Sequence, residues 1–369
     1  MQNFLSLLPW SALLAGGVAL MAAMLLVATQ HQHGHFSMDS TLGVQKFHIH
    51  PTTRVGGAAI ALGVLAGYAL AHPSRQSLLG PLLLAGSPAF VFGLLEDLTK
   101  RVSVRTRLLA TMACGVLGFG ITGLSITDAN LPGLDWLLGI TVVSVAFTAF
   151  AVGGVANAIN IIDGFNGLAA GTVIIILTSF GFMATALGDA DLAYTSLILA
   201  GAVLGFALVN WPLGKIFLGD GGAYFVGFAV AWLAVLLLAR HPEVSAWAPM
   251  LACGYPVLEV FFSIARRRRR KLSPGDADRL HLHSLVKRRV VRALLPRASN
   301  LLRNSVTGAL MWTAAFLPAI IAVNLPTHTP ALVLGFAVCA LLYSVVYARL
   351  TQFRWCFKAA TLAAKTSAA

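Results

Sequence analysis

The chain contains 369 residues, of which 58% are hydrophobic and only 11% are charged. Soluble domains contain about 25% charged residues, so the composition excludes a soluble globule, and it equally excludes a disordered chain, which would be poor in apolar residues. The apolar runs are continuous, whereas the strands of outer-membrane barrels alternate in polarity over about ten residues. The composition therefore predicts an all-α polytopic integral membrane protein.

The 26 Lys and Arg residues outnumber the 13 Asp and Glu residues, which gives a net charge of +13. In a membrane protein such an excess is typical of cytoplasmic loops, so we expect no nucleic-acid partner. The four cysteines form no CxxC pair and predict neither a disulfide framework nor a zinc site. No Lys or Arg precedes Lys46, so we interpret the first apolar run as a retained span rather than a signal peptide.

A hydrocarbon core of about 30 Å requires roughly 20 apolar residues per helix. On that measure we expect eleven membrane spans, of which the second is short and rich in glycine. The expected spans are residues 7–28, 57–72, 78–95, 106–124, 136–158, 168–187, 192–210, 222–239, 245–265, 304–324 and 329–349. Pro88 and Pro256 lie inside apolar runs and are expected to kink or break their helices.

The loops between these spans share the basic residues very unequally. One alternate set, with the basic span ends and the tail after Tyr347, contains 24 of the 26 Lys and Arg residues, and the other set contains only Arg75 and Arg240. The first set comprises residues 29–56, 96–105, 159–167, 211–221 and 266–303. By the positive-inside rule these loops are cytoplasmic, the N-terminus is outside and the C-terminus is cytoplasmic. We expect one transmembrane domain over residues 1–369, without internal repeats.

Unusual polar residues occur in each successive cytoplasmic loop. Arg54 offers a planar donor fork for phosphate, and Gly56-Gly57 after it permits close backbone approach to a ligand. The simpler alternative is an interfacial arginine beside glycines that pack helices. Glu96-Asp97 is an adjacent pair of carboxylates, which suits Mg²⁺ bound together with substrate phosphates. The alternative there is an ion pair between Glu96 and Lys100, four residues apart.

The third loop contains the stretch Asn157 to Leu168. Asn157, Asn160 and Asp163 recur at every third position, so they share one face of an apolar helix and require polar partners. Asn166 follows between two glycines, Gly164 and Gly167, which are expected to end the helix. A purely structural polar helix end is the alternative interpretation.

The fourth loop places Asp220 among glycines at the start of an apolar run, with Lys215 nearby. The stretch is not a Walker A motif, because Val209 and Ile216 stand where Gly and Ser or Thr are required. A carboxylate at a helix N-terminus can hold a cation and let anionic oxygens approach, although a simple glycine-rich turn is the alternative.

The fifth loop is strongly basic from Arg266 to Lys271 and then carries His281 and His283. The basic run is typical of lipid headgroup binding. The histidines can hydrogen-bond a diphosphate or transfer protons, or they are a chance surface pair. The topology brings Asp97, Asp163, Asp220 and His281 to one membrane face, a combination that suggests phosphoryl transfer.

In order and spacing, these five stretches resemble the bacterial polyprenyl-phosphate N-acetylhexosamine-1-phosphate transferases, the glycosyltransferase 4 family, over about residues 40–290. The resemblance implies transfer of a sugar-1-phosphate from a UDP-N-acetylhexosamine, by default UDP-GlcNAc or a derivative, to undecaprenyl phosphate, with release of UMP. It also implies Mg²⁺, with Mn²⁺ as a substitute, and a catalytic domain in the bacterial inner membrane with its active site on the cytoplasmic face. The product would start a lipid-linked cell-surface glycan. The formation of a homodimer is left as an open alternative.

The resemblance also assigns roles. Asp97 would orient or deprotonate the lipid phosphate, and Glu96, Asp163 and His281 complete the expected catalytic set. Asp220, together with Asp97, would bind the metal. The expected substrate-binding residues are Arg54, Lys100, Asn157, Asn160, Asn166, Lys215, His283 and Glu259. Three positions depart from the family pattern, because Glu96, Asn166 and Ser284 stand where many members have Asp, Asp and His.

Three other functions compete with this hypothesis. A transporter or flippase of lipid-linked sugars would bind its cargo near the bilayer midplane, but Glu259 is the only acid within an expected span. A non-catalytic lipid-binding scaffold gives no reason for Asn157, Asn160 and Asp163. An enzyme like phospho-MurNAc-pentapeptide transferase is disfavoured, because residues 281–284 are not its triple-histidine motif.

Overall fold

The computed structural model describes residues 10–39, 52–271 and 280–352 of the chain. His48 and His50 before Arg54, residues 272–279 of the basic loop and the tail after residue 352 lie outside the described residues. The regular secondary structure of the described part is helical apart from two two-residue strands, β1 (Met38–Asp39) and β2 (Thr52–Thr53), which pair antiparallel with Met38 opposite Thr53. The expected all-α class is confirmed.

The helices in chain order are α2 (Trp10–Ala28), α3 (Gln30–Ser37), α4 (Gly56–Ala69), α5 (Pro73–Thr99), α6 (Val104–Thr122), α7 (Leu134–Leu138), α8 (Thr141–Ile162), α9 (Leu168–Ala186), α10 (Ala190–Asn210), α11 (Gly219–Arg240), α12 (Trp247–Ala252), α13 (Gly254–Arg269), α14 (Leu282–Val286), the π-helical turn η1 (Lys287–Val291), α15 (Arg292–Leu294), α16 (Asn300–Asn324) and α17 (Thr329–Thr351).

Nine of these helices, within the described residues, are long and apolar enough to cross a membrane. They correspond to nine of the eleven expected spans, so the chain is a polytopic helical membrane protein. The other two are different in form: the span expected at 57–72 is the 14-residue helix α4, and the span expected at 245–265 is divided into α12 and α13. Pro256 lies in the first turn of α13, directly after this division, where its missing N–H costs little.

Pro88 does not break its helix, because α5 continues from Pro73 to Thr99 with both Pro81 and Pro88 inside it. Membrane helices tolerate internal prolines where neighbouring helices enclose the freed backbone groups. Here Gly86 and Ala89, on either side of Pro88, are buried, and α5 packs closely against α11. Of the kink or break expected at Pro88, the break is therefore wrong.

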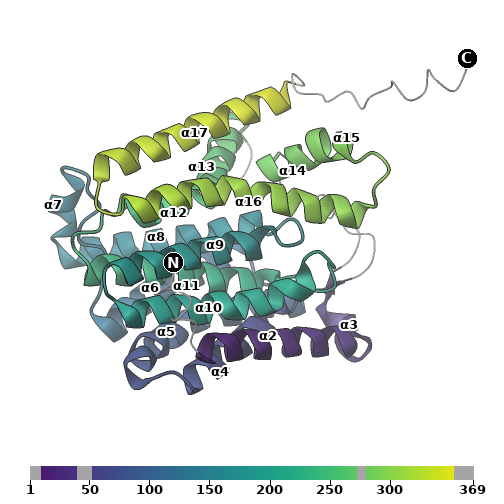
Figure 1. Cartoon of the computed structure of the whole chain (residues 1–369), viewed down its shortest axis with the longest axis horizontal. Coiled ribbons are helices and arrows are strands. Elements are labelled where there is room, and N and C mark those ends of the chain that lie inside the picture. Colours follow the sequence, from purple (N-terminus) through teal and green to yellow (C-terminus); the bar gives the residue numbers. More distant parts are fainter. Residues whose placement is uncertain (1–9, 40–51, 272–279, 353–369) are drawn as a thin grey trace, which may run out of the picture.

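The helix α11 lies at the centre of the bundle and packs against α4, α5, α8 and α9 (Figure 1). In the most apolar 18-residue stretch of α11, 83% of the residues are buried inside the protein. The corresponding fraction for α17, at the periphery, is 11%. Small residues make the central contacts close, as is common between membrane helices. A Cβ on Gly93 of α5 would lie 2.6 Å from the Gly221 nitrogen of α11.

Three helices extend beyond the spans expected from hydropathy. The helix α5 continues to Thr99, α8 to Ile162, and α11 already begins at Gly219. Hydropathy marks only the segment inside the hydrocarbon, whereas a helix can continue into the interface while its backbone hydrogen bonds are satisfied. Asp97, Asn160 and Asp220, which we expected in loops or at span ends, therefore lie on rigid helix ends.

Candidate active site

The segment that carries Arg54 is hydrogen-bonded to the loop before α11. The amide of Phe217 donates to the Thr53 carbonyl at 2.8 Å, and the amides of Gly56 and Gly57 donate to the carbonyls of Phe217 (3.0 Å) and Leu218 (2.9 Å). These bonds bring together segments about 160 residues apart in sequence. As a result, the guanidinium of Arg54 lies next to the first turn of α11.

Asp97 is 1% exposed and lies in the last turn of α5. Its Oδ1 accepts the amide N–H of Asp220 at 3.0 Å, and its Oδ2 accepts the amide N–H of Gly221 at 2.9 Å. The first amides of a helix lack partners within the helix, and a carboxylate satisfies them while interacting favourably with the helix dipole. Asp97 therefore fixes the end of α5 to the start of α11.

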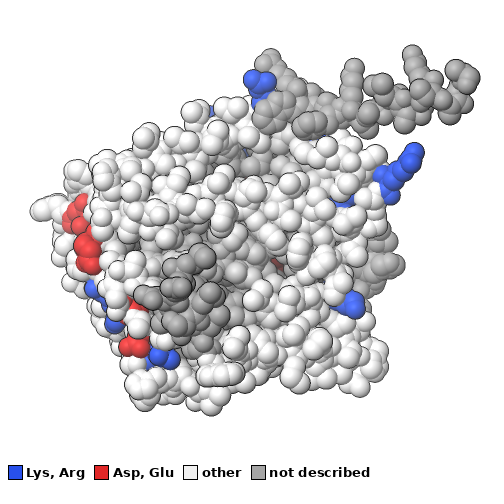
Figure 2. All heavy atoms as spheres, in the orientation of Figure 1, with Lys and Arg blue, Asp and Glu red and all other residues white. Residues whose placement is uncertain are grey.

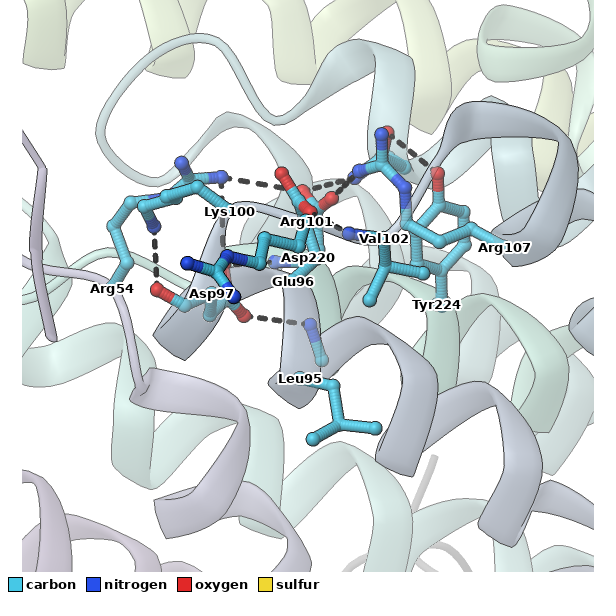
Figure 3. Close-up of polar contacts among 12 residues, drawn as sticks. Arg54, Leu95, Glu96, Asp97, Lys100, Arg101, Val102, Arg107, Asp220 and Tyr224 are labelled. Carbon is cyan, nitrogen blue, oxygen red and sulfur yellow. Dashed lines mark hydrogen bonds and ion pairs between the residues drawn. The ribbon is translucent and has the colours of Figure 1, made fainter. Parts of the chain in front are cut away.

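Asp220 forms the centre of a polar cluster at the start of α11 (Figure 3). Its Oδ1 lies 3.3 Å from Nη2 of Arg54 and accepts a 3.0 Å hydrogen bond from Nδ2 of Asn160. Its Oδ2 forms an ion pair with Arg107 of α6. The hydroxyl of Tyr224 donates to Oδ1 of Asn160 at 3.3 Å. Helices α6, α8 and α11 and the Arg54 segment thus contribute side chains to one cluster.

The guanidinium of Arg54 lies close to both buried carboxylates. The same Nη2 atom of Arg54 that lies 3.3 Å from Asp220 lies 3.5 Å from Oδ1 of Asp97. A positive charge between two carboxylate oxygens is the environment that a divalent metal ion also requires, and the all-oxygen donor set suits Mg²⁺. In the described part of the chain no three His, Cys, Asp or Glu residues gather into a fuller metal site, so substrate oxygens and water would supply the other ligands.

Asp163 lies one residue beyond the end of α8 and is half-buried. Its carboxylate accepts no hydrogen bond from the described residues, in contrast to Asp97 and Asp220. Burial raises the pKa of Asp163 to about 7, with Arg54 opposing this shift and Asp97 adding to it. A carboxyl group with a pKa near neutrality is suited to proton transfer.

Glu96, although adjacent to Asp97, is directed elsewhere. Its Oε2 accepts the amide N–H of Val102 at 2.8 Å, which closes the turn after α5. Lys100 occupies the left-handed region with φ of 58°, and its Nζ donates to the carbonyl of Asp97 at 2.5 Å. Glu96 and Lys100 therefore shape the turn that ends α5, next to Asp97.

The histidine motif packs against the loop that follows Asp163. The rings of His281 and His283 stack with centroids 5.2 Å apart, and His283 lies edge-on to Phe165 at 5.5 Å. A Cβ on Gly164 would lie 3.1 Å from Nε2 of His283. The histidines thus lie beside Asp163 in space although they are over 100 residues away in sequence.

Four of the expected substrate-binding residues do not belong to the Asp220 cluster. Asn157 donates to the Gly153 carbonyl within α8 at 2.8 Å, and Asn166 is buried and donates to Ser305 of α16 at 3.4 Å. Lys215 is exposed on its loop, where its amide donates to the Val209 carbonyl at 3.4 Å and its side chain has no polar contact with the described residues. Glu259 is 0% exposed, which places its carboxylate beyond the reach of a substrate.

The structure also contributes residues that the sequence did not single out. Arg107 was only one of several arginines after Glu96-Asp97, and its spacing does not reveal its contact with Asp220. Asn210 ends α10 and is buried, with its Oδ1 accepting the Gly167 amide at 2.6 Å and its Nδ2 donating to the Ile216 carbonyl at 2.7 Å. Lys287 lies 5.2 Å from the Phe165 ring, and burial lowers its pKa to about 8, with Arg303 adding to the shift. For Asn210, the only signal in the sequence was that a polar residue ends an apolar run.

The fold and the site define a polytopic helical membrane protein with a cluster of carboxylates and arginines at one end of its helices. Residues 79–238 match the profile of Glycosyl transferase family 4, and they include the Glu96-Asp97, Asn157–Asn166 and Asp220 stretches. This part of the chain is therefore similar to that family, in agreement with the resemblance inferred from the motifs.

Several curated proteins are similar to the chain. It is 29% identical over 240 residues to the "Probable undecaprenyl-phosphate N-acetylglucosaminyl 1-phosphate transferase" of Bacillus subtilis (strain 168), which covers 65% of this chain and 66% of that protein. It is 29% identical over 270 residues to the decaprenyl-phosphate N-acetylglucosaminephosphotransferase of Mycobacterium leprae (strain TN), covering 64% and 66%. It is 27% identical over 246 residues to the undecaprenyl-phosphate alpha-N-acetylglucosaminyl 1-phosphate transferase of Escherichia coli (strain K12), covering 63% and 65%. The chain thus spans just under two thirds of the length of these relatives.

Proposed function

We propose that the protein transfers GlcNAc-1-phosphate, or the phosphate of a related N-acetylhexosamine, from its UDP derivative to undecaprenyl phosphate. The observation that carries this proposal is the convergence of Arg54 and Arg107 on the buried pair Asp97 and Asp220. Two polyanionic substrates require both cationic side chains and a metal-binding carboxylate pair. The names of the relatives support the polyprenyl-phosphate acceptor and the N-acetylglucosaminyl group.

In this reaction a phosphate oxygen of the lipid attacks the phosphorus bonded to the sugar, and the bond from that phosphorus to the oxygen of the departing UMP breaks. Asp163 would hold or accept the proton of the attacking lipid phosphate, a role supported by its carboxylate having no hydrogen-bond partner among the described residues and by its pKa of about 7. Asp97, whose two oxygens accept backbone amides at the start of α11, would also hold Asp220 in position. Arg54 and Arg107 would bind phosphate oxygens.

Asp97 and Asp220 are the residues that would hold Mg²⁺, or Mn²⁺ in its place, and the ion would neutralise charge that develops on the diphosphate. The buried pair offers two carboxylates around one cationic nitrogen, as described above. Arg54 would then be available to bind substrate phosphate oxygens.

We also propose that the site faces the cytoplasm of a bacterial inner membrane, with the N-terminus outside and the C-terminus inside. Asp97 ends α5, Asn160 lies in the last turn of α8 and Asp220 begins α11, so successive crossings bring these residues to one face. At the opposite end, Arg75 pairs with Asp191 and Arg240 with Asp189, so acidic residues balance both arginines there. The acidic residues visible in Figure 2 gather at this end, beside α7, whereas mainly Lys and Arg are visible at the other end. The unbalanced basic residues thus share one face with the site, as the positive-inside rule requires.

A transporter of lipid-linked sugars is a weaker candidate. Transport sites lie near the bilayer midplane, often where helices are discontinuous. Here the carboxylate cluster lies at the ends of three long helices, and Glu259 beside the α12–α13 division has both carboxylate oxygens occupied by His281 and Leu282.

The proposal is tested with the purified full chain in detergent, supplied with Mg²⁺, undecaprenyl phosphate and a panel of UDP-N-acetylhexosamines. We expect release of UMP with at least one donor, and a loss of about 100-fold or more in kcat for Asp220→Asn, because charge stabilisation of this kind contributes on that order. Asp191→Asn, at the opposite end of the molecule, is the matched control and should retain activity. UMP release from no donor, or full activity after both Asp97→Asn and Asp220→Asn, would refute the transferase.

A further inference from the structure

We infer that Glu259 is a positioning residue for His281, fixing the imidazole so that only Nε2 is available to the substrates. Oε1 of Glu259 lies 2.9 Å from Nδ1 of His281. Glu259 is 0% exposed and His281 is 5% exposed, so the pair is enclosed by protein. The inference rests on the proposed transferase function for its consequence, although not for its geometry.

The hydrogen-bond pattern determines which nitrogen of His281 carries the proton. Both oxygens of Glu259 also lie 3.2 Å from the amide nitrogen of Leu282, which can only donate. A carboxylate that accepts these bonds is an acceptor toward His281 as well, so Nδ1 is the protonated nitrogen. Within the described residues Nε2 of His281 has no hydrogen-bond partner, and it is the nitrogen left to accept or donate a proton. The arrangement follows the general rule that a buried carboxylate orients a functional imidazole.

The surroundings of the pair connect it to the candidate active site. His283 stacks on His281 and lies beside Gly164, the residue after Asp163. The hydroxyl of Tyr255 lies 3.2 Å from Nδ1 of His283, so a second side chain of α13 holds the second ring. Side chains of the α13 helix therefore contact the Nδ1 atoms of both histidines. This gives a physical reason for a buried carboxylate at Glu259 that no substrate can reach.

The kinetic test uses Glu259→Gln, which keeps the shape of the side chain but loses its charge and presents an amide donor that competes with Nδ1–H. We expect kcat for UMP release to fall about 10- to 100-fold, the range typical when an orienting partner of a functional imidazole is removed. The KM for the UDP-sugar should change by less than about threefold, because Glu259 does not touch it. The conservative variant Glu259→Asp should recover part of the lost kcat.

The matched control is Glu243→Gln. Glu243 also lies beside a histidine, with Oε1 3.3 Å from Nδ1 of His241, but that pair is at the opposite end of the molecule. The Glu243→Gln variant should retain wild-type kcat. If Glu259→Gln retains wild-type kcat, or if Glu259→Gln and Glu243→Gln lose activity equally, the inference is wrong.

A second measurement is independent of catalysis. In protein labelled with ¹⁵N-histidine, the His281 signals are identified by their absence in His281→Gln, and their shifts report which nitrogen is protonated. We expect the Nδ1–H form in the wild type and a mixed or Nε2–H form in Glu259→Gln, with an unchanged elution volume to show that the variant is folded. The Nε2–H form in the wild type would overturn the inference even if the protein is an active transferase. The Nδ1–H form in a protein that releases no UMP would instead refute only the proposed function.

Discussion

Asp97, Asp163 and Asp220 have the same side chain but three different environments. Asp97 accepts two backbone amides and Asp220 is surrounded by Arg54, Arg107 and Asn160. Asp163 has neither kind of partner among the described residues and retains a raised pKa of about 7. These environments predict different roles for the three carboxyl groups. Asp97 joins the ends of two helices, Asp220 attracts cations, and Asp163 is the carboxyl group best suited to exchange a proton near neutral pH.

The raised pKa of Asp163 predicts a pH-dependent stability. An unfolded Asp has a pKa of about 3.9, so the folded protein binds this proton more tightly, and Asp163 costs stability progressively as the pH rises from about 4 to about 7. Asp163→Asn removes that cost. We expect the variant to melt a few °C above the wild type at pH 8 without divalent cations, and this difference to shrink toward pH 5.

Thermal unfolding of detergent-solubilised protein, followed by tryptophan fluorescence between pH 5 and pH 8, measures this difference. The same variant should release almost no UMP, so a gain in stability would accompany a loss of activity. A melting-temperature difference that is the same at pH 5 and pH 8 would show that Asp163 is not the titrating group.

At the scale of elements, the site depends on how closely α4, α5 and α11 approach one another. A Cβ on Gly57 of α4 would lie 2.2 Å from the Gly222 nitrogen and 2.4 Å from its Cα, both of which are backbone atoms that cannot turn aside. The same segment places Arg54 next to Asp220. The separation of these helices therefore sets the distance between the guanidinium and the two carboxylates.

Gly57→Ala should force α4 away from α11. We expect a loss of stability of about 1–3 kcal/mol, as for other overpacked sites, together with reduced UMP release. Gly120→Ala is the matched control, because Gly120 is an exposed glycine within α6 at which an added Cβ would have no heavy atom within 4 Å. That control should be neutral or slightly more stable. Melting temperatures of both variants decide the question, and equal effects would contradict the close-contact explanation.

The loops after α8 and before α11 are joined by one buried side chain, that of Asn210. Asn210→Ala would leave the Gly167 amide and the Ile216 carbonyl without their partner, at about 1–3 kcal/mol for each buried group left unsatisfied. We expect a lower melting temperature and a lower kcat/KM for the UDP-sugar. Asn324→Ala is the control, since Asn324 is exposed at the end of α16 and only donates to the Ile320 carbonyl. Wild-type kcat/KM in Asn210→Ala would show that the two loops are positioned without it.

For the whole molecule, the distribution of charge predicts the orientation. Cysteine is introduced at Asp128, on the exposed loop between α6 and α7, and at Lys215, on the exposed loop before α11. We expect a membrane-impermeant thiol reagent to label Asp128→Cys in intact cells and Lys215→Cys only after permeabilisation. The parent chain, which contains only its own cysteines, gives the background labelling. Labelling of Lys215→Cys in intact cells would reverse the proposed topology, as would a reporter fused at Ala369 that is found outside.

The sequence by itself determined the class and the common membrane face of the site. Hydropathy is a property of local segments, and the basic residues record the side of the membrane, so the helices and the grouping of Asp97, Asp163, Asp220 and His281 could be inferred from them. Local patterns fail at helix ends, because hydropathy changes at the hydrocarbon boundary while hydrogen bonding continues beyond it. They also could not show that Pro88 lies within a continuous helix.

Only the tertiary structure decided which polar residues touch one another. Arg107, Asn210 and the Glu259–His281 pair depend on contacts between segments far apart in the chain, which no spacing rule contains. The structure also separated roles that the motifs had grouped together, since Glu96 closes a turn and Asn166 packs against α16. A side chain's chemistry is set by the donors, acceptors and charges around it, and in a helical bundle most of these come from other helices.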